Sequence, residues 1–70
     1  MIYVVTYTLQ PWFLRDTTNI ARELRRLPNW SHWIHNTWLI STFETADGLY
    51  ERIRGYFLTT DRLLIAPFDA

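Results

Sequence analysis

The first segment of the chain, from Ile2 to Leu9, carries hydrophobic side chains on both of its alternating faces. Its residues, IYVVTYTL, are mostly β-branched or aromatic, which is typical of a strand that is covered on both sides. We therefore predict a strand in the middle of a sheet. Gln10-Pro11 should end it, because proline cannot donate a hydrogen bond to the ladder.

The hydrophobic period changes twice to that of a helix. From Asp16 to Leu27 the apolar residues recur at helical spacing, with Asp16, Thr17 or Thr18 as the N-cap and Pro28 as the stop signal. A second helix is expected to begin after Thr45 and to run to about Phe57. The apolar stripe of the first consists of Ile20, Ala21, Leu24 and Leu27, and that of the second of Ala46, Leu49, Tyr50, Ile53 and Phe57.

The segment between the helices predicts a hairpin. Residues 30–43, WSHWIHNTWLISTF, are rich in Trp, Ile and Thr and too long for one strand. The polar pair His35-Asn36 divides them into strands 30–35 and 37–43, and asparagine can take the left-handed conformation of a tight turn. Residues 62–66, RLLIA, form a last strand, which Pro67 closes at an end or edge position.

The resulting order of elements is strand, helix, strand, strand, helix, strand. With right-handed crossovers this pattern gives an α+β, ferredoxin-like βαββαβ domain over residues 1–70: a four-stranded antiparallel sheet with two helices on one face. The other face is left open, and we expect large aromatic rings among its side chains.

Size and composition favour a partner for that face. The chain has only 70 residues, of which 49% are hydrophobic, and it contains four Trp, four Tyr, four Phe and no Cys. A chain of this length buries about 60% of its unfolded surface, and it has neither disulfides nor thiolate metal sites to support it. A second copy of the chain is the simplest cover, so we expect a homodimer.

Charge restricts the partners only partly. Seven basic and seven acidic residues give a net charge of zero, so nucleic acid would have to bind to a local basic patch. Arg22, Arg25 and Arg26 form such a patch on the first predicted helix; a solvated helix face is the alternative. No apolar run is long enough to cross a membrane and no leader segment is recognised, so we expect a cytoplasmic protein without membrane contact.

Three stretches carry a resemblance to a known family. The opening YVVTYTL, the W-x-H that leads into TWLIST, and the late DRLLI resemble the SinR-like small proteins, which are related to the CRISPR-associated adaptation nuclease subunit and to the VapD toxins. The resemblance covers residues 2–66. It implies a ferredoxin-like fold, a homodimer and, in the nuclease branches, metal-dependent cleavage of RNA or DNA.

The chain departs from that family at the catalytic position. In the nuclease branches the first strand ends in Tyr followed by a metal-binding Asp, whereas here Tyr7 is followed by Thr8. A neutral hydroxyl is a far weaker ligand for Mg²⁺ than a carboxylate, so this departure argues against nuclease activity by the family's route. Asp16 is the only nearby acid that could substitute, although it also suits a helix cap.

Histidines and tryptophans are the remaining candidates for chemistry. His32 and His35 would point to opposite faces of a strand and so could not share one metal ion; no metal or cofactor is expected, except Mg²⁺ under a nuclease alternative. Trp30, Trp33 and Trp38 lie in the predicted hairpin, either in the core and dimer interface or as rings that stack on bases.

Three functions therefore stay open. The first is a non-catalytic homodimer that binds nucleic acid, a nucleotide or a protein. The second is a metal-dependent endoribonuclease of toxin type. The third is an accessory or anti-defence protein that acts by protein contact and is connected with a mobile element or with antiviral defence.

Overall fold

The computed structural model describes residues 1–11 and 15–68. The elements follow one another in the predicted order, with the second helix extended by a short 3₁₀ turn. They are β1 (Ile2–Thr8), α1 (Thr18–Arg25), β2 (Asn29–Ile34), β3 (Thr37–Ser41), α2 (Ala46–Ile53), η2 (Arg54–Tyr56) and β4 (Arg62–Pro67).

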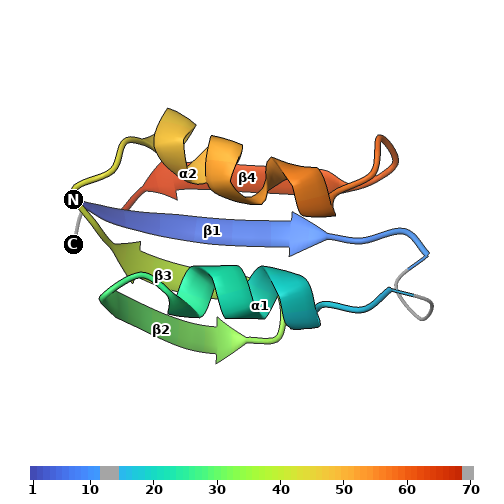
Figure 1. Cartoon of the computed structure of the whole chain (residues 1–70), viewed down its shortest axis with the longest axis horizontal. Coiled ribbons are helices and arrows are strands. Elements are labelled where there is room, and N and C mark those ends of the chain that lie inside the picture. The colour runs from blue at the N-terminus through green and yellow to red at the C-terminus, as the bar shows by residue number, and fades with distance from the viewer. Residues whose placement is uncertain (12–14, 69–70) are drawn as a thin grey trace.

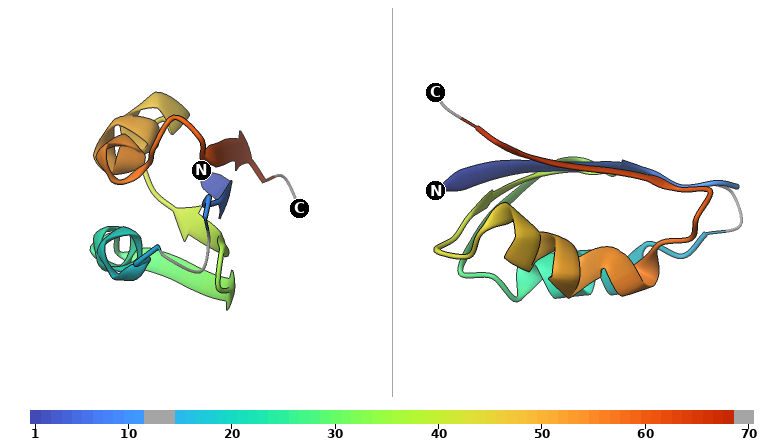
Figure 2. Two further views of the ribbon diagram at one scale, coloured as in Figure 1. Left: turned by 90° about the vertical axis from the view of Figure 1, so that its right-hand side faces the viewer. Right: turned by 90° about the horizontal axis from the view of Figure 1, so that it is seen from above.

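The four strands form one antiparallel sheet in the order β2-β3-β1-β4. β1 lies between β3 and β4, as its two apolar faces predicted, and β4 with its terminal Pro67 is an edge strand. Both helices pack against the same side of the sheet (Figures 1 and 2). The predicted α+β, ferredoxin-like arrangement is therefore confirmed.

The core lies between the helices and the covered side of the sheet. On that side β1 contributes Tyr3, Val5 and Tyr7, and the register sets Val5 beside both Trp38 and Ile65. The helices contribute their predicted stripes, apart from Tyr50, which is exposed. The fully buried side chains include Val5, Ile20, Leu24, Trp38, Ile40, Leu49 and Ile53.

The opposite side of the sheet has no helix over it, and we call it the open face (Figure 2). The strand registers place Ile2, Val4 and Thr6 of β1 on it, next to Leu39 of β3 and Leu64 of β4. The expectation of large rings here is wrong for β1 and β3, because their aromatic residues alternate onto the covered side. On β1 and β3 the open face is instead aliphatic, with hydroxyl side chains between the apolar ones.

The β2–β3 hairpin turns at His35-Asn36, where the sequence predicted it. His35 lies in the turn rather than on the strand, and a register shift between His32 and Ile34 marks a β-bulge. No described residue has a positive φ, so Asn36 does not adopt the predicted left-handed conformation. Its side-chain amide instead donates to the carbonyl oxygen of Tyr7 at 3.0 Å, which fastens the turn to β1.

The helices are shorter than the hydrophobic pattern suggested. α1 has Thr17 as its N-cap residue without a side-chain cap bond, and it ends before Pro28. α2 begins as predicted: the Thr45 hydroxyl accepts a hydrogen bond from the Gly48 amide at 3.0 Å, one of the amides that a helix start leaves without a partner. No helix in the described part of the chain is long and apolar enough to cross a membrane.

Two ion-pair networks hold the elements together. Asp61, between η2 and β4, pairs with Arg15 at 2.6 Å and accepts hydrogen bonds from the amides of Gln10 and Leu58. It therefore ties the segment after β1 to the turn before β4. The second network centres on Arg52 of α2, which binds Glu44 through two nitrogens and Glu23 of α1 through a third. Arg52 bridges the two helices rather than facing water alone.

Candidate functional site

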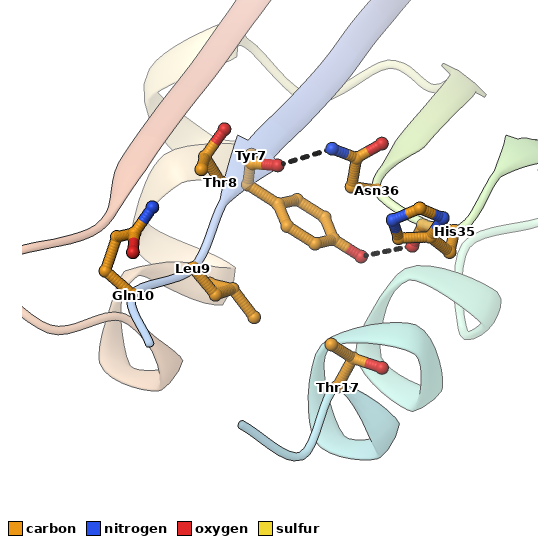
Figure 3. Close-up of a pocket in the computed structure, with 7 residues that line it drawn as sticks. All are labelled: Tyr7, Thr8, Leu9, Gln10, Thr17, His35 and Asn36. Carbon is orange, nitrogen blue, oxygen red and sulfur yellow. Dashed lines mark hydrogen bonds between the residues drawn. The ribbon is translucent and has the colours of Figure 1, made fainter. Parts of the chain in front are cut away.

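A pocket of about 260 Å³ opens at the end of β1, where the resembled family has its catalytic position (Figure 3). The residues around it come from the end of β1, the start of α1 and the β2–β3 turn. They are Tyr7, Thr8, Leu9, Gln10, Thr17, His35 and Asn36. The β2–β3 turn thus meets the end of β1 and the start of α1 at one end of the sheet.

Tyr7 forms a wall of this pocket. Its hydroxyl donates to the carbonyl oxygen of His35 and accepts a hydrogen bond from the indole N–H of Trp38, each at 3.2 Å. Burial raises the pKa of Tyr7, while the hydrogen bond from Trp38 acts in the opposite direction. The group is therefore a neutral phenol with both hydrogen-bonding functions in use, and its role is structural.

Thr8 and Asp16 are not brought together in the pocket. Thr8 stands opposite Arg62 in the β1–β4 ladder, and in Figure 3 its side chain points away from Leu9, Thr17 and His35. Asp16 accepts a hydrogen bond from the amide of Thr18 at 2.9 Å. Hydrogen bonds from Thr18 lower the pKa of Asp16, with a smaller effect from the charge of Arg22.

Asp16 thus satisfies one of the free amides at the start of α1, the helix-capping role that the sequence left open. Among residues 1–11 and 15–68 no group of three His, Cys, Asp or Glu side chains is placed to hold a metal ion.

A second surface lies where the end of α1 meets the edge strand β2. The Arg25 guanidinium lies over two indole rings, 5.6 Å from the centre of Trp30 and 5.5 Å from the centre of Trp38. His32 stacks on Trp38 with ring centres 3.9 Å apart and planes within 5° of parallel. Arg25, Trp30 and His32, with Arg22 next to them on α1, are called the α1–β2 surface below.

The three predicted phosphate-binding arginines have different surroundings. Arg25 contacts the tryptophans, whereas Arg22 donates to Asn19 at 3.3 Å. Arg26 pairs at 3.4 Å with Glu23, which also binds Arg52. Arg22 and Arg25 are exposed, and in the described part of the chain neither forms a salt bridge, although the charge of Arg22 acts on Asp16. These two arginines carry the local positive charge.

The three hairpin tryptophans also separate. Trp38 is completely buried because it is directed under the helices, so it belongs to the core and presents no surface to a base or a second subunit. Trp30 is 43% exposed and Trp33, at the β-bulge, is 67% exposed. Only these two could contact a partner.

Two features of these surfaces were missed by reasoning from the sequence. His32 presents a stacked ring beside Arg25, and His35 joins Thr17 and Gln10 around the pocket. The W-x-H spacing alone could have indicated that Trp30 and His32 share one strand face. Nothing local in the sequence places Thr17 beside the hairpin turn.

Comparisons of this chain with family models, with curated proteins and with solved structures give no match.

Proposed function

We propose that this protein is a homodimer that binds single-stranded nucleic acid on the α1–β2 surface and does not cleave it. The observation that carries the proposal is the placement of Arg25 over the rings of Trp30 and Trp38, beside the stacked ring of His32. The SinR-like resemblance supports a nucleic-acid partner, because the nuclease branches related to that family act on RNA or DNA.

The chemistry of the α1–β2 surface suits a single strand better than a duplex. Unpaired bases stack on exposed flat rings, and each stacked base is worth about 1–3 kcal/mol. Trp30 and His32 are both exposed on β2. Arg25 is held beside them by the indole rings, so little side-chain entropy is lost when it binds a phosphate.

Local charge can attract the phosphates although the chain is neutral overall. Arg22 and Arg25 lie three residues apart, which places them on neighbouring turns of one helix face. Contacts to phosphate carry no sequence information, so the proposed binding is of low sequence specificity. Its affinity should fall steeply with salt.

The proposal excludes cleavage for a chemical reason. Thr8 stands where the nuclease branches of the resembled family have a metal-binding Asp, and a threonine hydroxyl neither neutralises phosphate nor holds Mg²⁺ firmly. Asp16, the only nearby substitute, is engaged at the start of α1.

The open face supports the second half of the proposal, the homodimer. Ile2 and Leu64 are 40% and 56% exposed on it. Val4 follows Ile2 on the same side of β1 and stands opposite Leu39 of β3, while Leu64 of β4 stands opposite Thr6. Contiguous apolar surface on a sheet is poorly covered by water. A second copy of the same face would bury both, with the charged Arg62, opposite Thr8 at one end of the β1–β4 ladder, at the margin of the face.

Fluorescence anisotropy with labelled 12-nucleotide RNA and DNA, measured between 50 and 200 mM salt, tests the binding. We expect Arg25→Gln to weaken binding at least about fivefold and to lower the slope of log K against log salt by about 0.7. Arg54→Gln is the matched control, because Arg54 is an exposed arginine on the other helical segment, paired with Glu51. Absence of binding at 50 mM salt, or equal loss in both variants, would contradict the proposal, and so would cleaved RNA in the presence of Mg²⁺.

Sedimentation equilibrium tests the dimer. Leu64→Lys should shift the mass toward that of the 8.5 kDa chain. Leu58→Lys changes an equally exposed leucine outside the sheet and should leave the mass unchanged. A wild-type protein that stays monomeric at all concentrations rules out the dimer and leaves the binding proposal standing.

A further inference from the structure

We infer that the pocket at the end of β1 receives one base of the strand that binds along the α1–β2 surface. The inference rests on the proposed function and adds a position at which the protein takes up a base, rather than only a phosphate. It is carried by the shape of the pocket, by the side chains around it and by its location beyond the end of β2.

The pocket has the dimensions of a single ring system. Its volume of about 260 Å³ is just below the range of about 300–1,000 Å³ that is usual for drug-sized ligands. In Figure 3 the side chains of Leu9, Thr17 and His35 converge on the ring of Tyr7. A planar base fits such a space, whereas the sugar and phosphate of the same nucleotide would remain outside.

The walls combine apolar surface with hydrogen-bonding groups at the rim. Leu9 and the ring of Tyr7 supply apolar contact, and the Tyr7 hydroxyl is already satisfied by His35 and Trp38. The imidazole of His35 can stack on a base, and the Thr17 hydroxyl can bond to its polar edge, whereas the side chain of Gln10 lies on the Thr8 side of β1 (Figure 3). This set of groups matches an unpaired base better than a phosphate, because none of them carries a fixed positive charge.

The pocket continues the α1–β2 surface in one direction. β2 runs from Trp30 past His32 toward His35, and α1 runs the opposite way, so the start of α1 lies beside the end of β2 (Figure 1). Five residues of strand span about 16 Å, the length of about five stacked nucleotides at 3.4 Å each. A strand of that length would reach from Arg25 and Trp30 to the pocket.

A scan of abasic positions tests the inference. Each nucleotide of a labelled single-stranded hexamer is replaced in turn by an abasic site, in RNA and in DNA, and binding is measured at 50 mM salt. We expect one position near an end of the footprint to lose about tenfold in affinity when its base is missing. Thr17→Phe should abolish that dependence, because the ring would fill the pocket.

Thr17 suits this experiment because its side chain makes no cap hydrogen bond and is exposed. The salt dependence set by Arg25 should persist in Thr17→Phe, and thermal unfolding followed by circular dichroism verifies that the variant is folded. Thr59→Phe, an equally exposed threonine in the turn before β4, is the matched control and should keep the wild-type profile.

The outcomes separate the two proposals. If the wild type binds in a salt-dependent way but the abasic scan is flat, the pocket inference fails and the α1–β2 proposal stands. If Thr17→Phe is folded and keeps the wild-type abasic profile, the pocket is not the base site. If no oligonucleotide binds, both proposals fail together.

Discussion

Asp61 should contribute more to the stability of this fold than any exposed carboxylate. Its side chain is only 1% exposed, and its two oxygens accept three hydrogen bonds, at 2.6 Å from Arg15, 2.9 Å from the amide of Gln10 and 2.7 Å from the amide of Leu58. The Arg15 guanidinium, with the Leu58 and Gln10 amides, lowers the pKa of Asp61 from 3.8 to about 2, against the opposing effect of desolvation.

The size of the effect follows from that pKa. Each pKa unit corresponds to about 1.4 kcal/mol, so the ionised Asp61 adds about 2 kcal/mol to the free energy of unfolding at neutral pH. Because the pKa is lower in the folded state, this contribution is complete above about pH 4 and is lost as the pH falls from about 4 to about 2. For a domain of 70 residues, with a total stability of about 4–10 kcal/mol, the loss is large.

Asp61→Asn tests this reasoning. Both carboxylate oxygens face donors, so the amide nitrogen of Asn would meet an N–H in either orientation. We expect a loss of about 2–3 kcal/mol at pH 7, measured by urea unfolding followed by tryptophan fluorescence. Glu51→Gln is the control, because Glu51 and Arg54 form an exposed ion pair that should contribute less than about 0.5 kcal/mol.

The pH series provides the decisive comparison. The difference between wild type and Asp61→Asn should shrink by about 2 kcal/mol between pH 4 and pH 2, while the other carboxylates titrate in both proteins. A difference that stays constant over this range would refute the role of the charge and leave only a packing effect. The measurements are to be made at one protein concentration, because a dimer would add its own dependence on concentration.

Three further substitutions test the contacts around the helices and the pocket. Tyr7→Phe leaves the buried indole N–H of Trp38 without its acceptor and should cost about 1–3 kcal/mol in urea unfolding; an unchanged midpoint would mean that another acceptor takes over. Thr45→Ala removes the cap bond to Gly48 and should cost about 1 kcal/mol, with Thr45→Ser retaining most of it. Arg52→Met breaks the bridge between the helices and should lower the melting temperature by several degrees. If Arg52→Lys keeps the wild-type melting temperature, a positive charge alone stabilises the helix pair and the two-nitrogen contact with Glu44 is not required.

Local sequence patterns were enough to predict the order and nature of the elements. The run of β-branched and aromatic residues at positions 2–9 and the helical period around Ile20 and Leu24 each depend only on neighbouring residues. Pro28 and Thr45 marked a helix end and a helix start for reasons that are equally local. The helix lengths were overestimated, because an apolar stripe can continue into a turn that is no longer α-helical, as at Phe57 after η2.

The functional surfaces depend on contacts between distant segments. Arg22, Arg25 and Arg26 look alike in the sequence, yet only Arg25 lies over the indole rings, because packing of α1 against β2 directs it there. Asp61 shows the same limit, since the Leu58 amide is a local donor but Gln10 and Arg15 lie 51 and 46 residues away from it in the sequence.

The sequence by itself determined the order and type of the elements and the apolar stripe of each helix, because hydrophobic period and capping act over a few residues. Only the tertiary structure decided which side chains are buried and which contact one another. Trp38 lies in the core but Trp30 at the surface, and Thr17 and His35 line the same pocket. Burial and contacts of this kind depend on strand order and on the docking of the helices, which are properties of the whole packed chain.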